Sequence, residues 1–269
     1  MPRTTFLYHA EAVGVSGHIT LPVVDTVPLQ ASIASPLGEG SGKVCVENFK
    51  HLDYLRIDRI ESHVVSSYSE KDGAYGTLAS VAVEGLNNLN VVTCERMVNR
   101  LTSKHKLLSK EKDKMGGTEA GSFLLHGTHF DGLRIAGHDI KIELAIGLFS
   151  ELSTWKDLNH AYEKDPKIRK ELDALSLHPK EGGGKKLPLH NGVFACTLAT
   201  VVDRLPRGME RRDHGIYVPH FGTIYLAEYY ISETTRRLRM LHVDLGCSVE
   251  GCNGYGDTGG GGTPMPGSS

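Results

Sequence analysis

The chain has 269 residues, enough to bury a substantial core, and its 30 basic and 32 acidic side chains give a net charge of −2. This near balance provides no overall attraction to nucleic acid or to an anionic membrane surface. No apolar run approaches the roughly 20 residues that a helix needs to cross a bilayer. Composition therefore argues against a nucleic-acid-binding protein and against a membrane-spanning one.

The N-terminal segment bears on location. Residues 1–11 lack the apolar core of a secretory signal. We therefore expect a cytoplasmic protein, with an extracellular or cell-surface location as the alternative.

The first 150 residues carry β-type patterns. An unbroken alternation of polar and apolar side chains over Asp139–Leu144 is the clearest, because a period of two suits a strand with one buried face. Residues 86–101 fit either a helix or a strand. The other strands expected in this region are Phe6–Val13, Tyr54–Ser67, Thr77–Glu84, Phe123–His126, Gly132–Ala136 and a final one from Asp139 to Leu148.

Residues 153–178 break the β pattern and predict short helices. Ser153 or Thr154 can cap a first helix, and Asp165-Pro166 combines an N-cap side chain with proline at the first helical position. Ile168, Leu172 and Leu175 then form one apolar stripe. We expect this insertion to pack on a β core.

The last third returns to strands. Residues 223–232 and 237–245 predict a hairpin pair, in which Tyr225 and Tyr229 share one face, either closing the core or forming an exposed contact surface. Residues 253–269 are rich in glycine and bury little apolar surface, so we expect a flexible tail. Ordering against a neighbouring subunit is the alternative for that tail.

Together these patterns predict a mainly β protein. We expect one domain over residues 1–252, built as a β-sandwich or barrel-like sheet core with the helical insertion at about 153–178, followed by the glycine-rich tail 253–269.

The five cysteines form an odd, dispersed set, unlike the dense even set of a small disulfide scaffold. Cys45, Cys94 and Cys196 lie among apolar residues, which favours buried thiols. Cys247 and Cys252 are separated by four residues and would close a small loop in an oxidising compartment.

Three segments carry a resemblance to a known family: Ala10–Gly17, Ala79–Leu86 with Asn90–Thr93, and Phe130–His138. In their pattern these segments resemble the bacterial choice-of-anchor P group, over roughly residues 4–150. The resemblance implies a β-rich domain of the kind that bacteria export and tie to the cell surface. It implies no catalytic residues.

The densest group of potential metal ligands is His126, His129 and Asp131, with His220 as a further ligand from elsewhere in the chain. Residues two apart on a strand share a face, so His129 and Asp131 can point the same way. A metal site needs three or four converging ligands. His214 or His242 are the alternatives to His220, and ordinary strand or turn histidines are the alternative to a metal site.

Familiar catalytic motifs are missing. Residues 38–43 lack the first glycine and the final Ser or Thr of a phosphate-binding loop, and the chain contains neither a Gly-x-Ser-x-Gly elbow nor an HExxH helix. We therefore expect a non-enzymatic structural or interaction protein that associates with itself and uses no cofactor. The alternative is a metal-dependent or small-molecule enzyme with its histidine cluster in a barrel mouth or sandwich cleft.

Overall fold

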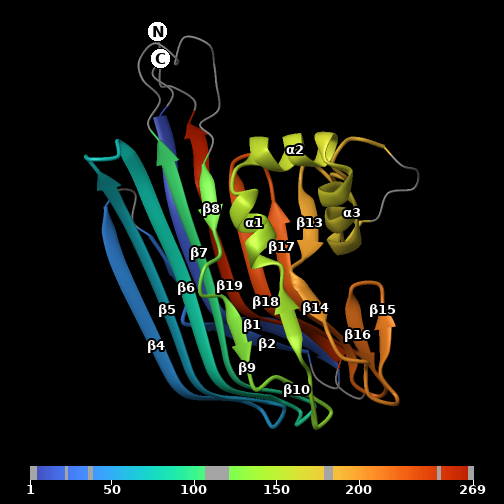
Figure 1. The fold of residues 1–269 in the computed structure, drawn as a ribbon. Coiled ribbons are helices and arrows are strands. Elements are labelled where there is room, and N and C mark those ends of the chain that lie inside the picture. The colour runs from blue at the N-terminus through green and yellow to red at the C-terminus, as the bar shows by residue number, and fades with distance from the viewer. Residues whose placement is uncertain are drawn as a thin grey trace.

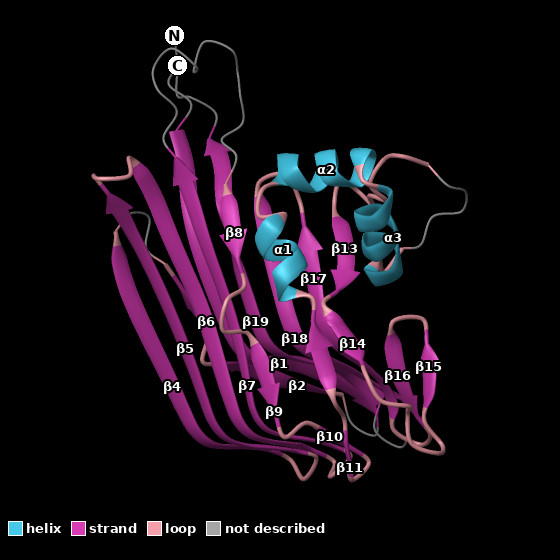
Figure 2. Ribbon diagram, in the orientation of Figure 1, coloured by secondary structure: helices cyan, strands magenta, loops and turns pink. Residues whose placement is uncertain are grey.

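The structure is a computed structural model that describes residues 5–21, 24–35, 39–106, 121–178, 184–246 and 250–265. Over these residues the protein is mainly β, as predicted, with antiparallel sheets and three short helices (Figures 1 and 2).

The larger sheet has nine strands in the described part of the chain, and its order is β15-β16-β17-β18-β19-β1-β2, with β13 paired to β17 and β3 to β1. The predicted hairpin of the last third is confirmed, because β17 and β18 pair antiparallel. The strands are β1 (Thr5–Leu21), β2 (Asp25–Gln30), β3 (Ile33–Ala34), β13 (Phe194–Thr197), β15 (Glu210–Arg212), β16 (Gly215–Val218), β17 (Gly222–Ile231), β18 (Thr235–Gly246) and β19 (Glu250–Met265).

The smaller sheet has eight strands over the described residues, in the order β11-β10-β7-β6-β5-β4, with β8 and β9 also paired to β7. Its long strands resolve the ambiguity at residues 86–101 in favour of β structure. The strands are β4 (Gly40–His51), β5 (Leu55–Ser69), β6 (Ala74–Asn88), β7 (Val92–Lys106), β8 (Ser122–Leu124), β9 (His129–Asp131), β10 (Arg134–Ile135) and β11 (His138–Asp139).

The two large sheets pack face to face around one apolar core, so the β-sandwich alternative describes them best. A buried amide also joins them. Asn99 of β7 donates to the carbonyl oxygens of Leu238 and Gly256 at 2.7 and 2.6 Å and accepts from the Thr258 hydroxyl at 2.9 Å. Buried polar groups satisfied in this way specify how the sheets are aligned.

The helical insertion covers the part of the larger sheet that the smaller sheet leaves free (Figure 2). It consists of α1 (Ile146–Glu151), α2 (Trp155–Lys164) and α3 (Pro166–Leu175), beside a two-stranded sheet of β12 (Ile142–Leu144) and β14 (Ala199–Val201). None of the helices in the described part of the chain is long and apolar enough to cross a membrane.

Both predicted helix starts are confirmed. The Thr154 side chain accepts a hydrogen bond from the Asp157 amide at 3.0 Å, and Asp165 accepts from the Lys167 amide at 2.8 Å. The single strand expected over residues 139–148 is wrong. Asp139 ends β11, Ile142–Leu144 forms the separate strand β12, and residues 146–151 form α1, where Phe149 packs edge-on against Tyr229 with ring centroids 5.3 Å apart.

The glycine-rich segment is not the flexible tail that its composition predicts. β19 lies between β18 and β1 in the larger sheet and pairs with both, so the boundary expected at residues 252–253 falls inside a strand. Backbone pairing on both sides offsets the cost of ordering. Glycine also permits close approach, because a Cβ on Gly261 would lie 2.5 Å from the Thr234 carbonyl oxygen. Residues 266–269 lie outside the described residues.

Left-handed residues interrupt the side-chain alternation of the long strands. In the larger sheet, Ala227 (φ 48°) of β17 and Gly256 (φ 61°) of β19 lie in one row across the strands, on either side of Met240. In β6, Gly85 (φ 67°) interrupts the alternation in the same way. Each interruption shifts the alternation by one position, as in a β-bulge. The side chains that share a face therefore change from one half of a strand to the other.

Candidate metal centre

The outer face of the larger sheet, which points away from the core, carries a cluster of polar side chains on β17, β18 and β19. The register pairs Tyr225 with His242 and Asp244 with Cys252, and paired residues in an antiparallel sheet share a face. Past Ala227 the alternation is shifted, so Glu228 joins this same face. Two separate stretches of β17 thus contribute to one cluster.

Three potential ligands converge at its centre. The Nε2 atom of His242 lies 2.9 Å from the Cys252 sulfur and 3.0 Å from Asp244 Oδ1, and the three ligand atoms all lie within 4.8 Å of one another. The His242 side chain is 16% exposed, whereas that of Asp244 is 49% exposed. The cluster is therefore anchored in the sheet and open to solvent on the Asp244 side.

Glu228 contacts Nδ1, the other nitrogen of the His242 ring. Its Oε2 lies 3.2 Å from His242 Nδ1, and its Oε1 lies 3.5 Å from His214 Nε2. Although burial opposes the charged carboxylate, these two histidines lower the pKa of Glu228 to about 2. A carboxylate that remains charged fixes the orientation of the imidazole and directs Nε2 toward Cys252 and Asp244.

Contact with an aromatic ring further restricts the orientation of the His242 ring. The Tyr225 ring stacks against His242 with centroids 5.2 Å apart and lies tilted against His214 with centroids 4.9 Å apart. Side chains locked by packing and hydrogen bonds hold a site in one geometry. His242 is thus positioned before any ligand arrives.

Two neighbours of this imidazole, Cys252 and Glu228, favour its charged form. Burial lowers the pKa of His242, but hydrogen bonds to Cys252 and Glu228 outweigh burial and raise it to about 10. A positive charge is therefore stabilised where the three side chains meet. A proton on His242 supplies that charge, and a metal cation bound at the same point would have to displace the proton into solvent and would bring more positive charge in its place.

The amino-terminal two thirds of the chain carry a family relationship. Residues 6–187 match a family described as a domain of unknown function (DUF8256). The chain belongs to the DUF8256 family. No curated protein and no solved structure matches the chain. The resemblance to the choice-of-anchor P group stays a prediction.

The DUF8256 match covers all strands of the smaller sheet and the three helices, but it ends before β13. His242, Asp244, Cys252 and Glu228 therefore lie outside the matched residues. The cluster belongs to the part of this DUF8256 protein that completes the larger sheet.

The structure only partly assembles the ligands expected from the sequence. His129 and Asp131 do share a face, with Nε2 and Oδ2 3.2 Å apart. His126 is exposed in the turn before β9, and His220 is exposed in the turn between β16 and β17. Among the described residues, His126, His129, Asp131 and His220 do not form a group of three converging ligands, whereas His242, Asp244 and Cys252 do.

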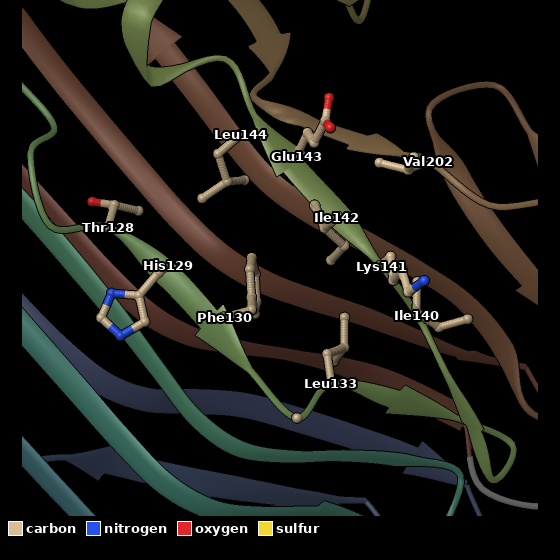
Figure 3. Close-up of a pocket in the computed structure, with 11 residues that line it drawn as sticks. Thr128, His129, Phe130, Leu133, Ile140, Lys141, Ile142, Glu143, Leu144 and Val202 are labelled. Atoms are coloured by element: carbon tan, nitrogen blue, oxygen red, sulfur yellow. The ribbon is translucent and has the colours of Figure 1, made fainter.

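A hollow of about 640 Å³ lies beside His129, between β9 and β12 (Figure 3). Aliphatic and aromatic side chains such as Phe130, Leu133 and Ile142 account for much of its lining. Both nitrogens of the His129 ring already have acceptors, Nδ1 with the Gly127 carbonyl oxygen at 2.8 Å and Nε2 with Asp131. This hollow therefore offers less convergent polar chemistry than the outer face of the larger sheet.

The sequence contained a signal for part of the His242–Asp244–Cys252 cluster. His242 and Asp244 are two apart in a predicted strand, the same spacing as His129 and Asp131. The sequence contained no such signal for Cys252. This residue lies beside Asp244 only because β19 pairs with β18, and the glycine-rich composition of β19 had predicted a flexible tail instead of a strand. The predicted pairing of Cys252 with Cys247 remains untested, since Cys247 lies outside the described residues.

Proposed function

We propose that this protein binds a divalent metal ion, zinc by ligand type, through His242, Asp244 and Cys252. The observation that carries the proposal is the meeting of a sulfur and a carboxylate oxygen at one imidazole nitrogen, at 2.9 and 3.0 Å. Nitrogen, sulfur and oxygen donors together suit zinc better than the hard cations calcium and magnesium.

The geometry requires little adjustment to accept an ion. From typical zinc bond lengths, two ligand atoms of a tetrahedral site lie about 3.4–3.6 Å apart. Each donor would have to move away from His242 Nε2 by about half an ångström. Rotation of the Asp244 and Cys252 side chains about their χ angles supplies such a movement without any shift of the strands.

Three protein ligands would leave the fourth position of a tetrahedral ion for water or an outside ligand, the pattern of catalytic rather than structural zinc sites. Asp244, whose side chain is 49% exposed, lies on the solvent side of the cluster, which supports an open position of this kind. Water bound to zinc ionises near neutral pH, so such a centre can generate a nucleophile for hydrolysis. Glu228 would be the outer carboxylate that orients the histidine ligand.

A cysteine nucleophile is the second candidate, because Cys252, His242 and Glu228 also follow the order of nucleophile, base and orienting carboxylate. Asp244 argues against this candidate. Its carboxylate competes with Cys252 for the same imidazole nitrogen, so His242 Nε2 is not directed at the sulfur alone. We therefore rank the metal centre first.

Cobalt(II) binding tests the proposal, because cobalt replaces zinc and reports on its ligands by absorption. Metal-free protein titrated with cobalt should show a thiolate-to-cobalt charge-transfer band that zinc removes. His242→Ala should abolish binding, and Cys252→Ser should remove the charge-transfer band.

His129→Ala is the matched control, since it removes the histidine that the sequence singled out. That variant should bind cobalt like the unmodified protein. The proposal is overturned if His242→Ala binds cobalt normally, or if His129→Ala loses binding. Rapid alkylation of Cys252 by iodoacetamide, unaffected by zinc, would favour the cysteine nucleophile instead.

A further inference from the structure

A second feature, independent of the metal cluster, lies at the far end of the smaller sheet. β4 is the last strand of that sheet and pairs only with β5 among the described residues (Figure 1). Ile33 of β3 packs over Gly42 from the core side without pairing with β4. A strand edge of this kind offers backbone N–H and C=O groups to another strand.

The side chains of β4 alternate cleanly. Lys43, Cys45 and Glu47 are exposed, whereas Val44 and Val46 face inward and pack against the core. Cys45 was expected to be buried with its apolar neighbours, but it lies on the exposed side. The centre of β4 is therefore a five-residue segment with charges at both ends of its outer face.

This segment is complementary to itself. When two copies pair antiparallel about a two-fold axis at Cys45, Lys43 lies opposite Glu47 of the partner subunit and Glu47 opposite the partner's Lys43. Val44 then meets the partner's Val46, which continues the apolar inner face. Axes at Lys43 or at Glu47 would instead place like charges opposite each other, which is destabilising.

The charges on the neighbouring strands continue the same pattern. The register aligns one row of alternating sign across the outer face of the sheet: Glu47, Arg59, Glu84, Arg96 and Asp131. Within that row, Arg59 lies 3.6 Å from Glu47, and Arg96 lies 3.5 Å from Glu84. The partner's Lys43 would add the next positive charge beside Glu47. Lys43 also lies 2.8 Å from Glu61, and its three N–H donors can serve both carboxylates.

We propose that two copies of this chain associate through β4, antiparallel about Cys45, to form one continuous sheet across the dimer. Only about five residues from each copy pair regularly, because Asn48 is left-handed (φ 54°) and ends the straight part of the strand. The dimer is thus expected to be reversible and to weaken at high salt.

Charge reversal tests this pairing by sedimentation velocity over a concentration series. The unmodified chain should show a concentration-dependent dimer. Lys43→Glu and Glu47→Lys should each weaken the dimer by at least about tenfold, because every cross-strand pair becomes repulsive. An equimolar mixture of these two variants should dimerise again, since both glutamates of the first variant then face lysines of the second. Lys50→Glu, a charge reversal on β4 outside the paired segment, is the control and should dimerise normally.

Disulfide cross-linking through Cys45 tests directly whether the two-fold axis of the dimer lies at this residue. Directly opposed residues in antiparallel strands have Cα atoms about 4.5–5.5 Å apart, within the range of a disulfide. Two Cys45 thiols and one oxidised glutathione should therefore give an intermolecular disulfide and two glutathione thiols. Cross-linking should disappear in Cys45→Ser and in each single reversal, and return in the mixture. A monomer at all concentrations, or a dimer unaffected by either reversal, would overturn the proposal.

Discussion

At the scale of single residues, Ala227 determines which side chains of β17 reach the candidate metal ligands His242, Asp244 and Cys252. Its left-handed conformation moves Glu228 onto the face of Tyr225 and leaves Tyr229 buried on the opposite face. The sequence predicted Tyr225 and Tyr229 on one face, because it assumed an uninterrupted period of two. That prediction was wrong, and an alanine with positive φ has no signature that sequence reasoning can use.

Removing the charge of Glu228 tests its orienting role. Glu228→Gln should weaken zinc binding about 10–100-fold, the usual cost of losing an outer carboxylate behind a histidine ligand. The thiolate-to-cobalt band should persist, because Cys252 is unchanged. Zinc titration by calorimetry measures the effect, with the exposed Glu143→Gln as control. Unchanged zinc affinity in Glu228→Gln would show that this carboxylate does not position His242.

His105 gives the fold a defined pH dependence. Burial, with smaller contributions from His9 and Arg236, lowers the pKa of His105 to about 4, whereas a histidine in the unfolded chain titrates near 6.5. Between these values the unfolded chain binds the proton and the folded protein does not. The free energy of unfolding should therefore not depend on the titration of His105 above about pH 6.5, and it should fall by about 3 kcal/mol between there and pH 4 as the unfolded chain takes up the proton.

Denaturant unfolding at several pH values measures this loss. His105→Gln cannot take up the proton, so its stability should depend less on pH in that window, whatever its stability at pH 7. The exposed His138→Gln should retain the pH dependence of the unmodified protein. If the free energy of unfolding depended on pH equally in His105→Gln and in the unmodified protein, His105 would not be the source of this pH dependence.

At the scale of elements, strands with regular alternation and helices with capping signals were predictable. β5, α2 and α3 appear where the residues placed them, since Leu55 and Ile57 alternate with charged neighbours and Thr154 and Asp165 cap their helices. β19 was not predictable, because its pairing depends on backbone groups and close approach rather than on side chains. The sequence therefore revealed the class of fold but not its central strand.

Removal of β19 distinguishes a structural strand from a dispensable tail. A chain that ends after Gly246 loses the partner of both β18 and β1 and also loses Tyr255, whose buried hydroxyl accepts from Asn88 at 2.7 Å. We expect this truncated chain to be unfolded or insoluble, as measured by circular dichroism and gel filtration. A folded, soluble product would mean that the larger sheet does not need β19.

At the scale of the whole molecule, the two proposed activities lie on different sheets. The candidate metal ligands lie on the outer face of the larger sheet, and the proposed pairing edge is at the end of the smaller one. Variants of Lys43 or Glu47 should therefore leave metal binding intact, and variants of His242 should leave association intact. Self-association, expected from the sequence, and metal binding at residues that the sequence only partly indicated can thus be tested separately.

Anomalous diffraction from crystals soaked in zinc tests the central claim most directly. We expect an anomalous peak at the zinc absorption edge within bonding distance of His242 Nε2, Asp244 and the Cys252 sulfur, with Glu228 still against His242 Nδ1. A peak at His129 and Asp131 instead, or no peak at the three proposed ligands in zinc-saturated protein, would contradict the account.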